Sequence, residues 1–516
     1  MPINFIPNDP QVLRPPMRVV SPRPQRAASR AGFTFIGAQP ENTFDPATAS
    51  AGFLFWQCRE AALGALAAWE DVSGKPFTFW QGSQRKIALR PDDGQELNAF
   101  YDRSSLSFFH FNAGSKVFLS GASTDIVAHE AGHGILDSIR PDLWDSPLFE
   151  VNAFHEAFGD CVAILTALLD GPSRAAVLPA IARQNFIAST GEDLAAGVKA
   201  SEPNHNAAAA RNARNAFVWQ LPSTLPDFAS PQDGPGKLIN EGHSFGQIFS
   251  GCFYDLIVNI FKANGGATEG QLRTATRTAG RLLSVAIATA PLKTRFFREV
   301  GRAMVKADEE ENAAANRDAI RNAFNGHDLP LGTGAMLAPI AALAGAAPTF
   351  KASAASLTAG AKKDLLARMG ATGRRTAVSA LRIGGTRVAE VLDERDLSLG
   401  HLASSLRGVV TRVQEAVLVG ASGGRAAVLG ALPEPVATSE DVDTFVRSLL
   451  KQGAIDLPGP RPKRAVGALA SRAAKPRASA VTHEIRSVGG KKVLSRVRFA
   501  CRCCVPALPF GISPAY

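Results

Sequence analysis

The chain has 516 residues, of which 46% are hydrophobic and 20% charged, as expected for a globular protein with a sizeable core. This length exceeds one ordinary core, so we expect two or three folding units. The net charge is +10, from 56 Lys or Arg and 46 Asp or Glu. Residues 461–498 carry eleven of the basic residues and one of the acidic residues, so the rest of the chain has 45 of each and is neutral. A neutral body argues against a nucleic-acid-binding catalytic domain.

The sequence shows no export or membrane signal. No stretch reaches the roughly 18–20 apolar residues that cross a bilayer, and residues 1–16 lack the apolar run of a signal peptide. We therefore expect no transmembrane segment and a cytoplasmic location, with non-classical export left open. The six cysteines have no disulfide-framework spacing, which fits a reducing compartment.

The first third of the chain predicts an extended segment, a helix and then strands. Residues 1–32 are rich in Pro and Arg and are expected to be extended. Apolar residues with helical spacing follow between Ala49 and Glu70. Four short strand-like runs come next, at 86–89, 97–101, 106–111 and 117–119. A helix is then predicted from Thr124 to Leu136.

The remainder of the chain predicts helices, a linker and a basic tail. Helical patterns cover 152–169, 245–261, 268–288, 293–306 and 313–324. Residues 331–360 are rich in Ala and Gly and are expected to be a linker. Residues 361–458, with amphipathic segments at 397–419 and 439–451, predict a small, mainly helical module of unknown function. Residues 459–516 predict a disordered basic tail that carries a cysteine cluster, Cys501, Cys503 and Cys504.

The helix from Thr124 contains a metal-binding pattern, His129-Glu130-Ala131-Gly132-His133. Histidines at i and i+4 share one helix face, so His129 and His133 can reach one tetrahedral zinc ion. Glu130 would lie beside the open coordination position, where it can take a proton from activated water. The alternative is two ordinary histidines beside a solvated glutamate. Leu136 and Ile139 stand where an extended metzincin motif needs Gly and His, which excludes that class.

A second helix offers the missing ligand. In Asn152–Asp160, Glu156 and Asp160 share a helix face. Glu156 can supply the third zinc ligand, and Asp160 can accept the ring N–H of a ligating histidine. The alternative is an amphipathic helix with two solvated acids, and only the neighbouring His-Glu-x-x-His pattern favours the ligand interpretation.

These residues resemble the thermolysin-like, or gluzincin, zinc metallopeptidases. Further resemblance lies in Asn98–Tyr101, in residues 119–128 leading into the zinc helix, and in residues 297–324. The likeness covers residues 33–330. It implies an α+β catalytic domain with a β-rich lobe, a helical lobe and a cleft between them. It also implies an edge strand where the Asn98 side chain and the Ala99 backbone hold a peptide substrate.

The resemblance further assigns His243, in Glu241–Gly246, as a donor to the oxyanion of the reaction, with Glu241 as a candidate acidic partner. The alternative for His243 is a helix-capping or exposed histidine. Where the family has a Tyr near the oxyanion, this chain has Trp144, whose indole N–H could donate instead. His155 replaces the usual Asn before the Glu ligand. It is interpreted as a neighbour of the ligands rather than as a fourth ligand.

Other departures concern calcium and regulation. Asp125 matches one ligand of the family's double calcium site, but Ala167 stands in the place of a Glu, so we expect this site to be incomplete. The family's secretion signal and inhibitory propeptide are not found.

The sequence thus predicts a zinc metalloendopeptidase with a protein or peptide substrate and no need for nucleic acid. The alternative is a catalytically inactive binding protein that acts through its cleft or its basic tail, which could contact an acidic partner. A peptidase that cuts itself or one partner is a further possibility.

Overall fold

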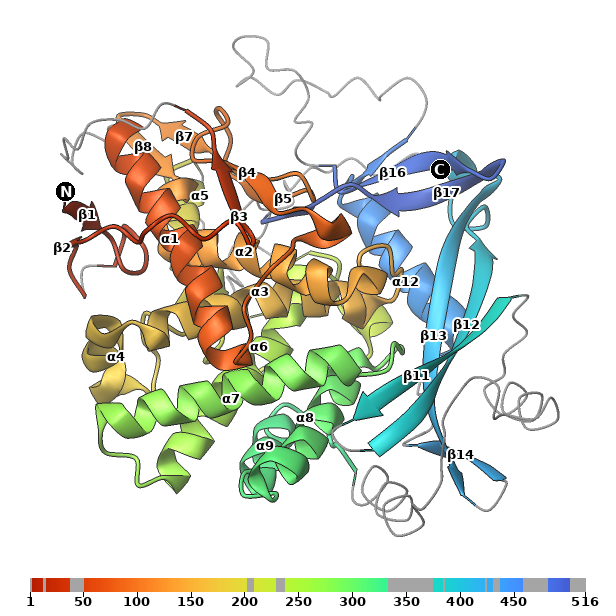
Figure 1. Cartoon of the computed structure of the whole chain (residues 1–516). Helices are drawn as coiled ribbons and strands as arrows, with labels where there is room; N and C mark the ends of the chain where they lie inside the picture. The colour runs from red at the N-terminus through yellow and green to blue at the C-terminus, as the bar shows by residue number, and fades with distance from the viewer. Residues whose placement is uncertain are drawn as a thin grey trace.

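The computed structural model describes residues 2–12, 15–37, 51–201, 208–228, 237–332, 375–383, 386–422, 425–429, 437–457 and 481–501. Within these ranges helices and strands are mixed, which confirms the predicted α+β class (Figure 1). The extended N-terminal segment forms one small hairpin, in which β1 (Ile3–Phe5) pairs with β2 (Arg18–Val20).

A five-stranded sheet lies above the central helices in Figure 1. Its order is β18-β5-β6-β4-β3, with bounds β3 Gly32–Phe35, β4 Lys86–Arg90, β5 Ala99–Tyr101, β6 Ser105–Phe108 and β18 Phe499–Ala500. A hairpin of β7 (His110–Ala113) and β8 (Lys116–Leu119) follows β6. β18 comes from the far end of the chain and pairs antiparallel with β5, so the predicted edge strand is covered.

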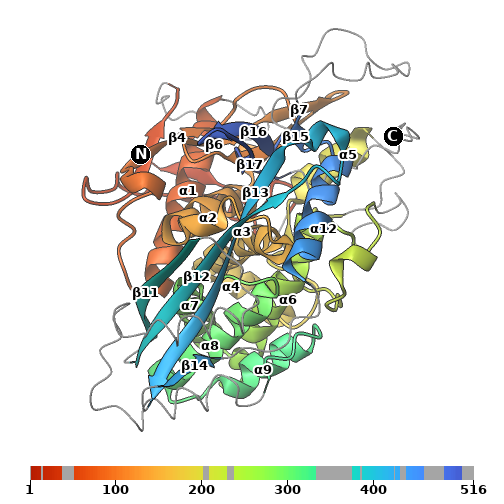
Figure 2. The same ribbon diagram turned by 90° about the vertical axis from the view of Figure 1, so that its right-hand side faces the viewer.

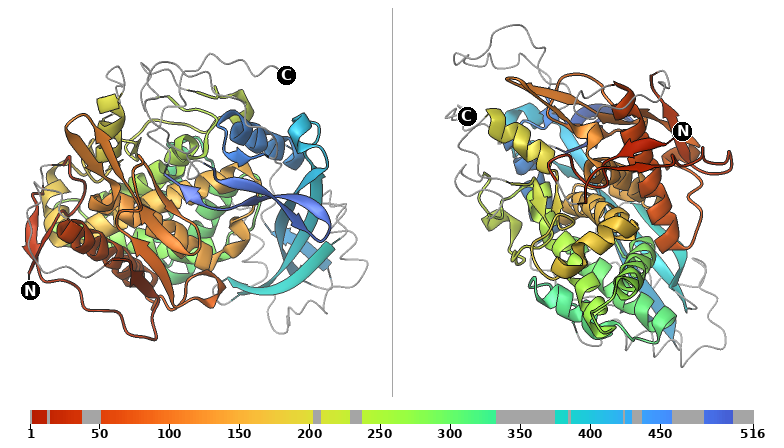
Figure 3. Two further views of the ribbon diagram at one scale, coloured as in Figure 1. Left: turned by 90° about the horizontal axis from the view of Figure 1, so that it is seen from above. Right: turned by 90° about the vertical axis from the view of Figure 1, so that its left-hand side faces the viewer.

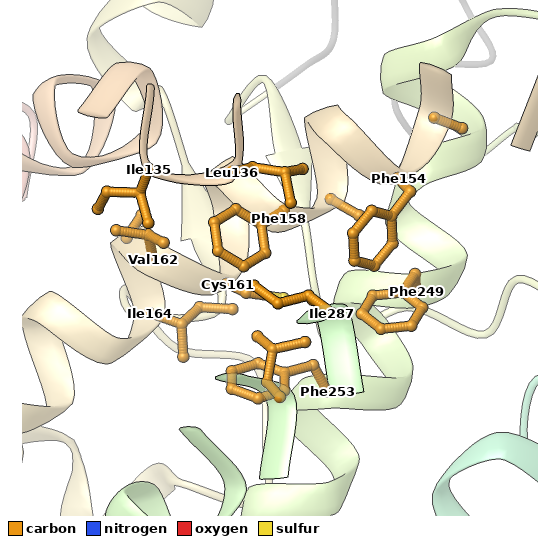
Figure 4. Packing of buried hydrophobic residues seen from close by; sticks show 14 of the residues in the cluster. Ile135, Leu136, Phe154, Phe158, Cys161, Val162, Ile164, Phe249, Phe253 and Ile287 are labelled. Atoms are coloured by element: carbon orange, nitrogen blue, oxygen red, sulfur yellow. The ribbon is translucent and has the colours of Figure 1, made fainter. Parts of the chain in front are cut away.

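Long apolar helices form the core below this sheet. They are α1 (Ala51–Ser73), α2 (Thr124–Ile139), α3 (Phe149–Leu169), α6 (Gly242–Ala263) and α7 (Glu269–Thr289). Figure 4 shows side chains of α2 and α3 meeting those of α6 and α7, among them Ile135, Phe158, Phe249 and Ile287. These rings and aliphatic groups are buried, and burying each contributes about 1.5–3 kcal/mol.

Shorter elements surround this core. They are α4 (Gly171–Val177), β9 (Ser189–Thr190), α5 (Glu192–Ser201), β10 (Arg211–Asn212), α8 (Phe296–Asn312) and α9 (Arg317–Asn325). Each helix predicted between 49 and 324 is present, with bounds that differ by a few residues.

The mainly helical character expected for 361–458 is wrong for the residues described there. They form β11 (Arg375–Ile383), β12 (Thr386–Ser398), β13 (Val409–Ser422) and β14 (Arg425–Leu429), with one helix, α12 (Thr438–Lys451). Figure 2 shows β12 and β13 as long strands across one side of the helical part. Val409, Thr411 and Val413 are buried and the residues between them are only half-buried, which is strand periodicity. The linker expected at 331–360 lies almost wholly outside the described residues.

Part of the tail that was expected to be disordered is folded. β16 (His483–Val488) and β17 (Lys491–Arg496) form a hairpin that pairs with β15 (Ile455–Asp456) and with β13. These strands belong to a second sheet, which also contains β11, β12 and β14. The turn of the hairpin is Gly489-Gly490, with φ of +57° and +78°. Both values lie in the left-handed region that a two-residue hairpin turn requires and that glycine adopts without strain. Cys503 and Cys504 lie outside the described residues.

No single helix in the described ranges is long and apolar enough to cross a membrane. The bent pair Phe149–Leu169 and Gly171–Ala180 meets that test by length and composition alone.

Candidate metal centre

The centre depends on a close contact between α2 and α3. A Cβ on Gly132 would lie 2.8 Å from the Cα of Gly159, and a Cβ on Gly159 would lie 2.5 Å from Nδ1 of His129. No ordinary side chain fits at either position. Two glycines therefore let the backbones approach closely, and this brings the side chains of His129 and His133 to Glu156.

Three potential ligand atoms converge in the buried space between these helices. Oε2 of Glu156 lies 3.4 Å from Nε2 of His129 and 3.6 Å from Nε2 of His133. None of these three atoms has a hydrogen-bond partner of good geometry among the described residues. Ligands of a tetrahedral zinc ion, about 2.0–2.1 Å from the metal, lie roughly 3.3 Å apart. The donor set and spacing therefore fit zinc.

Glu130 is also buried, and neither of its carboxylate oxygens has a hydrogen-bond partner among the described residues. It belongs with His129 and His133 to a group whose ligand atoms lie within 4.8 Å of one another. Burial raises the pKa of Glu130 to about 8, against the opposing charge of His129. A carboxyl group whose pKa is near neutral is suited to taking up and releasing a proton.

Asp160 lies where the sequence predicts, with Oδ1 2.9 Å from Nδ1 of His129. Arg211, in β10, donates from Nε to the same oxygen at 2.8 Å and is buried. Burial would raise the pKa of Asp160, but the Arg211 charge and the His129 hydrogen bond hold it below its usual value. Asp160 is therefore ionised and directs Nε2 of His129 toward Glu156.

The two histidines differ in their surroundings. Burial lowers the pKa of His133 to about 4, so this ring is neutral. Burial also acts on His129, but the hydrogen bond to Asp160 and the nearby carboxylate of Glu156 raise its pKa to about 9. Two neutral imidazoles and a carboxylate are the form that binds a metal, so His129 must release its proton when a metal binds.

His243 lies on the other side of Glu156, at the start of α6. Its Nδ1 is 2.6 Å from Oε1 of Glu241, and its Nε2 is 3.0 Å from Oε2 of Glu156. Despite burial, the charges of Glu156 and Glu241 raise the pKa of His243 well above its ordinary value. The ring is therefore protonated and can donate from both nitrogens. Glu241 is the acidic partner that the sequence suggested.

The strand predicted to hold a substrate borders the centre. The Asn98 side chain accepts a hydrogen bond from the Ala99 backbone N–H at 2.9 Å, and the Ala99 carbonyl accepts one from Cys501 N–H at 2.8 Å. Trp144 donates from Nε1 to the Arg496 carbonyl at 3.2 Å. Of these three residues, Ala99 and Trp144 thus form hydrogen bonds with the segment Arg496–Cys501, whereas the Asn98 side chain bonds only its own neighbour Ala99 in the contacts described.

His155 lies beside His133, with ring centroids 5.8 Å apart. Burial lowers its pKa well below the ordinary value, and neither nitrogen has a hydrogen-bond partner among the described residues. Its ring stacks on Phe499 at 4.0 Å, so it forms a wall next to the ligands.

A second group that could hold a cation lies at the N-terminal end of α2. Asp9, Asp125 and Glu192 bring carboxylate oxygens within 4.8 Å of one another. Asp125 was expected from the family resemblance, and Asp9 and Glu192 were not. Ala167, where the family has a Glu, is a buried core residue of α3.

Sequence reasoning missed Arg211 and the residues of β18. Arg211 stands in an Ala- and Asn-rich stretch without periodicity, so no local signal marks it as buried. The hairpin before β18 did carry a signal, because Gly489-Gly490 is a two-residue turn pattern between short runs that contain the β-branched residues Ile485, Val488 and Val493. The high density of Lys and Arg outweighed that signal.

Comparison with models of known families and with curated proteins found no match to this chain.

Proposed function

We propose that the protein is a zinc-dependent endopeptidase and that residues 33–330 form a thermolysin-like catalytic domain with the metal centre in its cleft. The observation that carries this proposal is the convergence of Nε2 of His129, Nε2 of His133 and Oε2 of Glu156 in a buried space. Glu130 and His243 flank these atoms as a base and a donor.

The three converging side chains would hold the zinc ion, which when bound supplies Lewis-acid activation of a water and of the peptide carbonyl. Asp160 keeps Nε2 of His129 turned inward by accepting the proton on Nδ1, and Arg211 holds Asp160 in place by donating to it. The proton that water loses passes to a carboxylate oxygen of Glu130. As the peptide C–N bond breaks, Glu130 passes it to the departing nitrogen.

His243 acts on the oxygen of the reacting carbonyl. Its Nε2–H points into the space beside Glu156, and Glu241 holds the proton on Nδ1. The peptide carbonyl oxygen gains negative charge only as water adds to the carbon. A cationic donor in a buried site therefore stabilises the transition state more than the bound peptide.

The first prediction is that Glu130→Gln retains zinc but lowers kcat/KM for a peptide substrate by about 10²–10⁴-fold, because no carboxylate receives the proton. The measurements are zinc content of the purified chain and cleavage of a fluorogenic peptide. Glu269→Gln is the control, since its side chain is 42% exposed on α7.

Zinc-bound Glu130→Gln with full activity would contradict the mechanism. A zinc-loaded chain that binds peptides without cleaving them, in every variant, would instead support the alternative of a binding protein.

A further inference from the structure

The C-terminal segment Arg496–Cys501 lies in the candidate active site. Figures 1 and 3 show the blue C-terminal strands beside the orange strands of the first sheet. β18 pairs antiparallel with β5 in the register Phe499 to Tyr101 and Ala500 to Phe100, and Cys501 N–H donates to the Ala99 carbonyl. The segment thus occupies the strand edge that an extended peptide would need.

The peptide bond between Ala500 and Cys501 faces the catalytic groups. Nε2 of His243 lies 3.0 Å from the Ala500 carbonyl oxygen and 3.0 Å from Oε2 of Glu156. The Ala500 carbonyl is therefore bound by the donor assigned to the reacting carbonyl, next to one of the metal ligands. On the other side of this peptide bond, the sulfur of Cys501 accepts a hydrogen bond from Nη1 of Arg211 at 3.5 Å.

The Phe499 side chain covers the metal ligands from outside. Its ring stacks on His133 at 4.7 Å and on His155 at 4.0 Å, with an edge contact to Trp144 at 5.3 Å. Phe499, Ala500 and Cys501 are each no more than 2% exposed. A substrate could not reach these groups while the segment is in place.

Arg496 anchors the segment at its entrance. Its backbone N–H donates to Asp145 at 2.8 Å, its Nε donates to the Trp144 carbonyl at 2.9 Å, and its guanidinium also bonds the Asn152 side chain. The guanidinium lies 3.9 Å over the Phe499 ring. Arg496 is also the last residue of β17, so the segment is tied to the second sheet.

We propose that this segment is a built-in inhibitor, bound as a substrate strand with Ala500–Cys501 at the scissile position, and that peptides are cleaved only when it leaves. The proposal rests on the proposed function for its effect on activity. The occupancy of the cleft does not depend on that function. Because the segment is part of the same chain, its effective concentration at the cleft is high, on the order of millimolar or more.

The test uses the full, zinc-loaded chain with two separate substitutions, Arg496→Ala and Phe499→Ala. Each removes contacts of the segment and none of the groups that act on a substrate. We expect each to raise kcat/KM for a fluorogenic peptide about tenfold or more, since the open population rises with the loss of these contacts. Thermal unfolding and zinc content verify that each variant is folded and loaded.

Arg486→Ala is the matched control, because Arg486 lies in β16 of the same hairpin with a side chain that is 52% exposed. It should leave kcat/KM unchanged. A wild-type chain that cleaves the peptide as fast as both segment variants would overturn the proposal.

A binding experiment separates this proposal from the function. The peptide acetyl-Arg-Val-Arg-Phe-Ala-Ser-amide, which copies the segment with Ser for Cys, is titrated by calorimetry into zinc-loaded Glu130→Gln, with and without Arg496→Ala. We expect binding only with Arg496→Ala. Equal binding by both chains, or by neither, would overturn the inhibitor proposal. Binding as expected without hydrolysis by any chain that retains Glu130 would overturn only the peptidase function.

Discussion

At the scale of single residues, the centre depends on one buried aspartate that is shared by two partners. Asp160 accepts hydrogen bonds from His129 and Arg211, both of which are buried. The His129 contact fixes the tautomer of a candidate ligand, and the Arg211 contact keeps the aspartate ionised and in place. The metal affinity of His129 should therefore depend on a residue that never touches the metal.

The second prediction is that Asp160→Asn weakens zinc binding about 10–100-fold, because the amide neither compensates the Arg211 charge nor orients His129 in the same way. Competition with a chelator of known affinity measures this. Asp71→Asn serves as the control, since Asp71 lies on α1 and pairs with Arg277 at the surface. An unchanged zinc affinity in Asp160→Asn would show that Asp160 does not orient His129 for metal binding.

Sequence reasoning anticipated the grouping of those candidate residues whose proximity follows from local spacing. His129, His133, Glu156 and Asp160 lie on helices, where spacing of three or four residues brings side chains to one face. Glu241 follows from its distance of two residues from His243. Arg211 could not be predicted, because its contact with Asp160 joins the short strand β10 to α3, 51 residues apart in the chain.

At the scale of elements, Gly132 on α2 and Gly159 on α3 allow the close helix contact that brings the candidate ligands together. The backbones meet where a methyl group would overlap an atom of the facing helix. Interiors are close-packed, so an added group there must move a helix.

The third prediction is that Gly159→Ala destabilises the chain by about 1–3 kcal/mol and lowers zinc affinity, because the added methyl group would overlap the His129 ring. Denaturant unfolding and zinc titration measure the two effects. The control is Gly270→Ala in α7, where only the Thr268 hydroxyl lies near the new Cβ, at 4.0 Å. This control should be neutral or stabilising by up to about 1 kcal/mol. Equal stability and equal zinc affinity in the two variants would show that the contact between α2 and α3 leaves room for a methyl group.

The helices were predictable because they are long and their apolar residues recur with a clear period. The strands β12 and β13 were not, because Val, Leu and Ala residues there satisfy a helical spacing as well as alternation. Val409, Val410, Thr411 and Val413 favour a strand by their β-branched side chains, a signal that the apolar spacing obscured.

At the scale of the whole molecule, segments far apart in the sequence meet at a cluster of two buried carboxylates and one half-buried carboxylate. Asp9, Asp125 and Glu192 come from the N-terminal segment, α2 and α5. Burial, with the charges of Asp125 and Asp9, raises the pKa of Glu192 to about 10. The folded chain therefore holds this proton at neutral pH, whereas the unfolded chain releases it near pH 4.5, the ordinary pKa of a glutamate.

The fourth prediction concerns pH. A raised folded-state pKa gives stability that is fully present below about pH 4.5 and is lost as pH rises toward about 10. In the presence of a chelator, Glu192→Gln should raise Tm at pH 8 by a few degrees, and the gain should shrink at pH 5. Scanning calorimetry at the two pH values measures it, with the exposed Glu440→Gln as control. A Tm gain that is larger at pH 5 than at pH 8 would contradict the predicted direction of the pH dependence.

The position of β18 also has a consequence for the order of events during synthesis. The ribosome synthesises the residues of the candidate metal centre, from His129 to His243, on the order of 250 residues before it reaches Arg496. At about 5–20 residues per second, the nascent chain carries an uncovered cleft for roughly 10–50 s. On the proposed function, zinc and a neighbouring polypeptide both have access to the centre during this interval. The inhibitor that we propose takes effect only after residues 496–501 have been synthesised.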